Sequence, residues 1–300
     1  MFIFEACKTK VDVIENNTQP ETTTTKELSL DITTTNKLLY FMIKDIVKDR
    51  HNVEYMFTDK DKLWNFDFTE DSISNISKKD IFFYFGSGLE PWAQAFVDSL
   101  RKDTVAPVNV SRGVKFIDFD REIKYKDAPL KTNPYFWLSI DDYKIAMLNI
   151  KNAIQDKDSK NRDFYEENFS KTIKEVEDYQ RRLKEVTAKL KDVTFVTDGD
   201  KLDYFIRTYG FQNLKLYNYG LILTEEEQQK NKIVENEFIN PNNIVFLYDT
   251  KEMLESNKDI VEKFKLKTCN IVVYSDDMDY KSILNNNLNS LERLASDLEL

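Results

Sequence analysis

One long stretch of the sequence contains no residue that would end a helix. From Ser159 to Lys191 there is neither glycine nor proline, and apolar residues recur at spacings of three, four or seven. Charged residues fill the other positions, so the pattern predicts one amphipathic helix, roughly 48 Å long at 1.5 Å per residue. Taken alone, such a helix is also typical of a coiled coil or a bundle.

The segments on both sides of this stretch indicate whether the helix belongs to a coiled coil or bundle, or instead joins two lobes. Before it come the strand patterns "LSLDITTT" and "IFFYF", with a helix pattern between them that opens at Asn36, and a short helix that opens at Thr69. After it come "VTFVTD", "NIVFLYD" and "CNIVVYSDD", again separated by helix patterns. Strands that alternate with helices indicate mainly parallel sheets. The sequence therefore predicts an α/β protein with two lobes, joined by one long rigid helix.

The predicted organisation has four parts. Residues 1–27 form a signal remnant and flexible linker, because an apolar stub is followed by Cys7 and a polar, threonine-rich run. The N-terminal lobe covers 28–150, the linking helix 151–192 and the C-terminal lobe 193–300. Ala6 and Cys7 before a polar linker resemble a lipoprotein processing site, which predicts a lipid on Cys7. The alternative is a cytoplasmic tail without lipid.

Charge and residue counts exclude several classes of function. The formal net charge of -10 disfavours a nucleic-acid binder, which needs an electropositive face. The only histidine, His51, follows a predicted helix and is expected to be a surface turn residue. Cys269 opens an apolar strand and is expected to be a buried thiol. No Ser–His or Cys–His pair is available, because the only histidine is placed in a surface turn, so we predict that the protein is not an enzyme.

Five segments together resemble one protein family. They are "LDITTTNKLLYFMIKDI", "KKDIFFYFGSGLEPW", "NPYFWLSIDDYKIAMLNI", "KDVTFVTDGDKLDYFIRTYGF" and "NNNLNSLERLASDL". The resemblance is to the solute-binding lipoproteins of zinc- and manganese-uptake ABC transporters. It implies a ligand cleft between the two lobes, a monomer anchored outside the cytoplasm by lipid, and permease and ATPase partners. It implies no resident cofactor, with a divalent cation, manganese, zinc or another, as cargo.

The sequence departs from this family at the positions that bind metal. The three positions that match the family's imidazole ligands are occupied by Trp64, Tyr135 and Gly199, and the position of the carboxylate by Asp276. A zinc site of nitrogen and sulfur ligands is therefore excluded. Oxygen ligands suit harder cations such as Mn²⁺, Mg²⁺ or Ca²⁺. The weaker candidate ligands are Asp67, Asp198, Asp200 and Asp277. The alternative for these aspartates is a role as helix caps and solvated loop ends.

The two aromatic replacements leave several functions open. Trp64 and Tyr135 can fill the former metal cavity, or stack on an organic ligand or a cation, while Gly199 makes room. The main prediction is an extracytoplasmic solute-binding component of a metal-type ABC transporter whose metal binding is doubtful. The alternative is a cell-surface interaction or adhesin-like module that kept the fold and lost ligand binding.

Overall fold

The computed structural model describes residues 28–58, 60–100, 104–216, 224–237 and 243–299. The predicted linker 1–27 and the lipidation at Cys7 therefore lie outside the described residues. Within the described ranges, no helix combines the length and the apolar composition that crossing a lipid bilayer requires.

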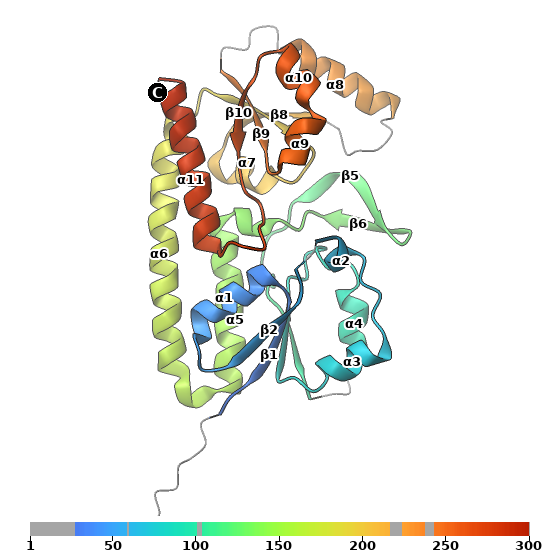
Figure 1. Cartoon of the computed structure of the whole chain (residues 1–300), viewed down its shortest axis with the longest axis vertical. Coiled ribbons are helices and arrows are strands. Elements are labelled where there is room, and N and C mark those ends of the chain that lie inside the picture. The colour runs from blue at the N-terminus through green and yellow to red at the C-terminus, as the bar shows by residue number, and fades with distance from the viewer. Residues whose placement is uncertain (1–27, 59, 101–103, 217–223, 238–242, 300) are drawn as a thin grey trace, which may run out of the picture.

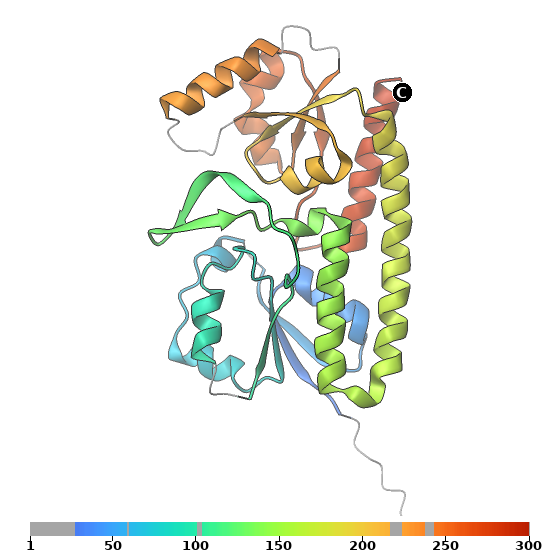
Figure 2. The same ribbon diagram turned by 180° about the vertical axis from the view of Figure 1, so that it is seen from behind.

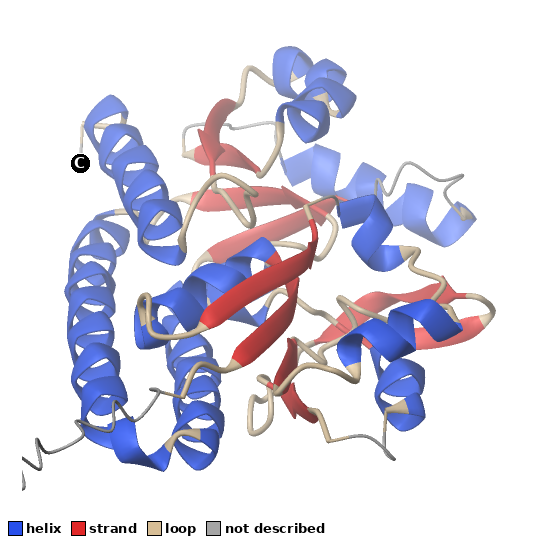
Figure 3. Cartoon of the chain, turned by 60° about the horizontal axis from the view of Figure 1, so that its bottom comes forward, coloured by secondary structure: helices blue, strands red, loops and turns tan. Residues whose placement is uncertain are grey.

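The first lobe is built on a four-stranded parallel sheet in the order β2-β1-β3-β4. Its elements are β1 (Asp31–Asn36), α1 (Lys37–Val47), β2 (Asn52–Phe57), α2 (Lys60–Trp64), α3 (Glu70–Ile76), β3 (Ile81–Tyr84), α4 (Ala93–Ser99) and β4 (Ala106–Asn109). Every residue of β3 is buried, as expected for a central strand covered on both faces. Figure 3 shows helices packed around these strands.

Two of the helix starts expected in this lobe are confirmed by their caps. The Asn36 side chain accepts a hydrogen bond from Leu39 N–H at 3.0 Å, and α1 begins directly after it. Thr69 caps α3 and shares a capping box with Ser72. Such side chains satisfy backbone N–H groups that have no partner in the first turn of a helix.

The second lobe is also built on a four-stranded parallel sheet, in the order β10-β9-β7-β8. Its elements are β7 (Thr194–Asp198), α7 (Asp203–Tyr209), β8 (Gln212–Leu216), α8 (Glu225–Glu237), β9 (Ile244–Tyr248), α9 (Lys251–Ser256), α10 (Lys258–Lys263) and β10 (Lys267–Asn270). The predicted α/β fold with two parallel lobes is thereby confirmed.

A layer of three long helices runs along both lobes (Figures 1 and 2). It consists of α5 (Ile140–Lys157), α6 (Arg162–Lys189) and α11 (Tyr280–Asp297). The range 151–192 is not the single helix that we predicted, because α5 ends at Lys157 and the chain reverses through a short 3-10 helix, Ser159–Asn161. Asp158 has non-helical backbone angles there and is buried, where it accepts hydrogen bonds from Asn161 and Tyr165.

An antiparallel hairpin lies between the two lobes (Figures 1 and 2). It is formed by β5 (Asp118–Tyr125) and β6 (Ala128–Thr132), with Lys126 and Asp127 at positive φ in the turn. The sequence pattern did not predict these strands. The hairpin leads through Asn133 into the 3-10 helix Phe136–Leu138 and then into α5.

His51 is buried, with 4% of its surface exposed, so the expectation of a surface turn residue is wrong. Its Nδ1 lies 3.3 Å from Leu30 N, and its Nε2 lies 2.6 Å from the Tyr165 hydroxyl. The ring therefore joins the start of β1 to the beginning of α6. Cys269 is buried in β10, as predicted, and burial raises the pKa of its thiol to about 12.

A candidate ligand cavity between the lobes

Three of the four predicted ligand positions line one cavity. Its volume is about 390 Å³, and Trp64, Tyr135 and Gly199 all contribute to its wall. Both lobes and the β5–β6 hairpin take part. The other described residues of the wall are Phe119, Ile123, Pro134, Asp198, Asp200, Lys201 and Met253. Most of these side chains are apolar or aromatic, which is typical of sites for small organic molecules.

Trp64 enters the cavity wall from the end of α2 in the first lobe. Its ring meets the edge of Tyr125 of the hairpin, with the ring centroids 6.1 Å apart and the planes at 89°. Trp64 is half-buried, as expected of a side chain that lines a cavity and does not fill a core. Indole and phenol rings prefer this edge-to-face arrangement, so Tyr125 supports the orientation of Trp64.

Tyr135 is held in the wall by the residues next to it. Its backbone N–H donates to Asn133 Oδ1 at 3.1 Å, and its ring packs edge-on against the buried Trp137 at 5.6 Å between centroids. Burial raises the pKa of the Tyr135 hydroxyl, which therefore stays protonated near neutral pH. A protonated phenol can donate one hydrogen bond and also offers an aromatic face.

Asn133 connects Tyr135 to the opposite lobe. It is fully buried, and its Nδ2 donates to the backbone oxygen of Asp200 at 2.6 Å. Its own backbone oxygen accepts a hydrogen bond from the Tyr204 hydroxyl at 3.3 Å. The sequence analysis did not identify Asn133 as a site residue, although it is the first residue of the quoted "NPYFWL" motif. It fixes the distance between the Tyr135 and Gly199 sides of the cavity.

Gly199 occupies the turn that follows β7. Its φ is +71°, a left-handed conformation that costs glycine little because it has no Cβ. Its N–H donates to the Leu216 backbone oxygen at 2.9 Å, which keeps the turn against the end of β8. At Gly199 itself the turn therefore presents only backbone to the cavity.

Asp276 and Asp277 are not among the described residues of the cavity wall. Asp276 accepts a hydrogen bond from the Tyr274 hydroxyl at 2.7 Å, and the exposed Asp277 lies 3.9 Å from the Lys37 ammonium. Asp67 is also exposed, and it pairs with Lys126 at the tip of the hairpin. The structure therefore brings Trp64, Tyr135 and Gly199 together without the carboxylate expected to complete the set.

Asp198, the other carboxylate in the wall besides Asp200, has a neutral partner. Its Oδ2 accepts a hydrogen bond from Asn257 Nδ2 at 2.7 Å. Next to it, the Lys201 ammonium pairs with Asp249 at 3.1 Å. Burial lowers the pKa of Lys201, but the attraction of Asp249 and the hydrogen bond to it, together with Tyr135 and Asp198, outweigh this and the pKa lies above its usual value. Lys201 therefore carries its charge at the cavity.

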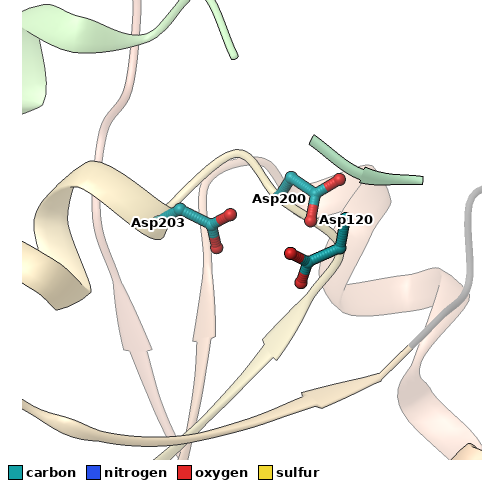
Figure 4. A group of neighbouring side chains, drawn as sticks. All are labelled: Asp120, Asp200 and Asp203. Carbon is teal, nitrogen blue, oxygen red and sulfur yellow. The ribbon is translucent and has the colours of Figure 1, made fainter. Parts of the chain in front are cut away.

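Asp200 belongs to a cluster of three carboxylates that surrounds one lysine. Oxygen atoms of Asp120, Asp200 and Asp203 lie within 4.8 Å of one another (Figure 4). The Lys215 ammonium lies 2.6 Å from Asp120, 2.8 Å from Asp200 and 2.9 Å from Asp203. Burial raises the pKa of Asp203 to about 6, against the opposing effect of Lys215. A position suited to a metal cation is thus taken by a cation of the protein itself.

Among the described residues, neither the imidazole nor the thiol is part of this cavity. His51 is bonded at the far end of the first lobe, and Cys269 is buried in β10. Neither is among the described wall residues. Zinc sites in proteins use mainly these nitrogen and sulfur ligands. The described residues of the wall therefore offer carboxylate oxygens but no imidazole or thiol.

Comparisons with known proteins agree with this architecture. A family model described as zinc-uptake complex component A, periplasmic (ZnuA), matches residues 32–293. The high-affinity zinc uptake system protein ZnuA of Bacillus subtilis is 23% identical over 222 residues, 72% of this chain and 70% of that protein. A metal ABC transporter substrate-binding lipoprotein of Lactococcus lactis is 25% identical over 68% of this chain and 65% of that protein.

A solved structure has the same fold. The metal-dependent lipoprotein YcdH from Bacillus subtilis superposes with a TM-score of 0.70 at 20% identity, covering 88% of this chain and 98% of that chain. These relatives are uptake and binding proteins and not enzymes, as predicted. The resemblance inferred from the five sequence segments is confirmed by the family match over 32–293. The chain therefore belongs to the zinc-uptake complex component A (ZnuA) family.

Proposed function

We propose that this protein is the extracytoplasmic solute-binding component of a metal-type ABC transporter and that its cleft does not bind zinc tightly. Membership of the ZnuA family supports the transporter role, with a permease and an ATPase as partners. A lipid on Cys7, outside the described residues, is the anchor in this proposal. The relative from Lactococcus lactis is named as a lipoprotein, which agrees with such an anchor.

One observation carries the proposal about the cleft. Trp64, Tyr135 and Gly199 line the same cavity, and none of them offers a nitrogen or sulfur ligand. Indole N–H can only donate a hydrogen bond, and a protonated phenol is a poor ligand for zinc. The position is therefore preserved as a cavity, while its metal-binding chemistry is replaced.

The carboxylates do not compensate for the missing imidazoles. Lys215 contacts oxygen atoms of Asp120, Asp200 and Asp203, so a divalent ion would have to displace a buried ammonium. Calcium and manganese need several oxygen ligands at once, at roughly 2.0–2.6 Å. In this arrangement the lysine satisfies the carboxylates that such an ion would use.

The test is a metal titration of the full chain after treatment with a chelator. Zinc and manganese are added in calorimetry, and the melting temperature is measured in parallel. We expect no saturable binding at the cavity and no rise in melting temperature. Binding of one zinc ion per chain with a clear rise in melting temperature, lost in Asp198→Asn, would contradict the proposal.

The transporter role needs a separate test in the native membrane. Cross-linking of the full chain, followed by mass spectrometry, should identify a permease subunit of an ABC transporter. Cross-links only to other surface or host proteins would instead favour the cell-surface interaction or adhesin-like module that the sequence left as the alternative.

A further inference from the structure

The wall of the cavity offers aromatic faces from three different elements. Trp64 comes from α2, Phe119 from β5, and Tyr135 from the segment after β6. All three side chains are half-buried. Ile123 and Met253 add apolar surface from the hairpin and from α9. A volume of about 390 Å³ accommodates a small organic molecule, because such sites span roughly 300–1,000 Å³.

The electrostatic environment of this aromatic wall is negative. Among the described residues, the side chains of the second lobe and the hairpin named above as forming the wall or pairing with it contain five carboxylates and two ammonium groups. The carboxylates are Asp120, Asp198, Asp200, Asp203 and Asp249, and the ammonium groups are Lys201 and Lys215. Asp200 and Asp249 have side chains only 2% exposed, so water screens their charges weakly.

We propose that the cavity binds a small organic cation, a compact apolar body that carries an ammonium group. This inference rests on the proposed function, since it names the class of solute that the transporter component would capture. Aromatic faces attract ammonium groups through their quadrupoles, and groups of aromatic side chains recognise alkylated ammonium ligands. The excess of carboxylates adds attraction that does not require the ligand to displace Lys201 or Lys215.

Other classes of ligand fit these walls less well. An anion would meet more carboxylates than ammonium groups. A neutral apolar molecule would gain from the aromatic surface but nothing from the charges. A bare metal ion would leave most of the volume unused, and it would have to compete with Lys215 for Asp200 and with Asn257 for Asp198 Oδ2.

Matched pairs of probes separate the effect of charge from the effect of shape. Choline is compared with 3,3-dimethylbutan-1-ol, and phenethylammonium with 2-phenylethanol, by calorimetry on the full chain. We expect each cation to bind about tenfold more tightly than its neutral counterpart, the order expected for cation–π contacts in a desolvated site. Equal affinities within both pairs, or no binding of either cation, would overturn the inference.

Substitutions in the cavity wall test whether the preference for the cationic probe arises at the cavity. Trp64→Leu and Tyr135→Leu keep an apolar side chain but remove the aromatic face. We expect each to reduce the preference for choline over 3,3-dimethylbutan-1-ol to about twofold, as expected if most of the cation–π attraction is lost. Tyr55→Leu, at an exposed aromatic residue of β2, is the control and should leave this preference unchanged. A preference that survives in both cavity variants would contradict the assignment.

Failure of the inference about the solute can be distinguished from failure of the proposed function. Tight zinc binding at the cavity would overturn the proposed function, whatever the organic probes do. Absence of zinc binding together with equal affinities for the charged and neutral probes would overturn only the inference about the solute.

Discussion

The Tyr165 hydroxyl lies 2.6 Å from His51 Nε2 and donates its proton to Asp158 Oδ2 at 2.5 Å. Because that proton is used, His51 Nε2 must carry its own proton and donate to the Tyr165 oxygen. His51 Nδ1 is then the acceptor for the Leu30 N–H at 3.3 Å. A neutral imidazole satisfies every hydrogen bond of this network, which connects the start of β1 to the turn between α5 and α6.

Tyr165→Phe should lower the free energy of unfolding by about 2–3 kcal/mol. The change removes the partner of a buried imidazole and of a buried carboxylate, and unsatisfied groups of this kind cost about 1–3 kcal/mol each. Denaturant unfolding at pH 7 measures the effect. Tyr55→Phe, at an exposed tyrosine, is the control and should change stability by less than about 0.5 kcal/mol. Equal effects of the two substitutions would contradict the network.

Acidification should destabilise the protein through His51. Burial holds the pKa of His51 below 6.5, the value expected in the unfolded chain. Below pH 6.5 the unfolded state therefore binds a proton that the folded state resists, and stability falls as the pH is lowered. His51→Gln should lose this dependence just below pH 6.5, even if its overall stability is lower. An unchanged slope in that window would exclude His51 as its source.

Asp203 should produce a pH dependence of the opposite sign. Burial raises its folded pKa from 3.8 to about 6. The folded state therefore retains a proton that the unfolded state releases, and stability falls as the pH rises from about 4 to 6. Two pKa units correspond to at most about 3 kcal/mol. Asp203→Asn should remove this decline, as measured by denaturant unfolding at pH 4, 5, 6 and 7. Parallel profiles for the variant and the wild type would contradict the prediction.

Lys215→Met should convert the carboxylate cluster from an ion pair into a metal site. Without the ammonium, the cluster of Asp120, Asp200 and Asp203 is uncompensated, which should cost roughly 3–5 kcal/mol. Calcium or manganese should then stabilise the variant, by about 2.7 kcal/mol at a hundred times the dissociation constant. Thermal unfolding with and without the ion measures both effects.

The matched control for this substitution is Lys126→Met, which removes the exposed pair with Asp67. Exposed pairs contribute little, so stability should hardly change and metal should have no effect. Stabilisation of the wild type by the same ions, to the same degree as the Lys215→Met variant, would show that Lys215 does not exclude them.

The triple variant Trp64→His, Tyr135→His and Gly199→His should bind zinc. Three imidazoles would then face one cavity, and zinc accepts such ligands at about 2.0–2.1 Å. We expect a rise in melting temperature with zinc that the wild type lacks. The double variant that retains Gly199 should respond more weakly. A triple variant that folds but whose melting temperature does not change with zinc would show that these positions do not lie close enough together to share one ion.

Local patterns predicted the parts of the fold that depend on neighbouring residues. The Asn36 and Thr69 caps lie immediately before their helices, and the apolar run of β3 signals a buried strand directly. Motif order also placed Trp64, Tyr135 and Gly199 at one site, although each comes from a different part of the chain.

Features that depend on distant partners were missed or predicted wrongly. His51 is buried because Tyr165, 114 residues later, supplies its bond, and nothing near His51 in the sequence indicates this. Lys215 meets Asp120 across 95 residues. The β5–β6 hairpin is largely polar, and its turn places Lys126 and Asp127 at positive φ in place of the usual glycine. Its strands therefore lack both common hairpin signals.

Lys215 is a cation that the chain carries on its own side chain. A bound metal ion leaves when its concentration falls or a chelator competes for it, whereas an ammonium group on a covalent tether keeps a constant local concentration. The link that Lys215 makes between the hairpin and the second lobe is therefore independent of the supply of metal ions. A binding protein built in this way keeps its cavity walls assembled under metal starvation.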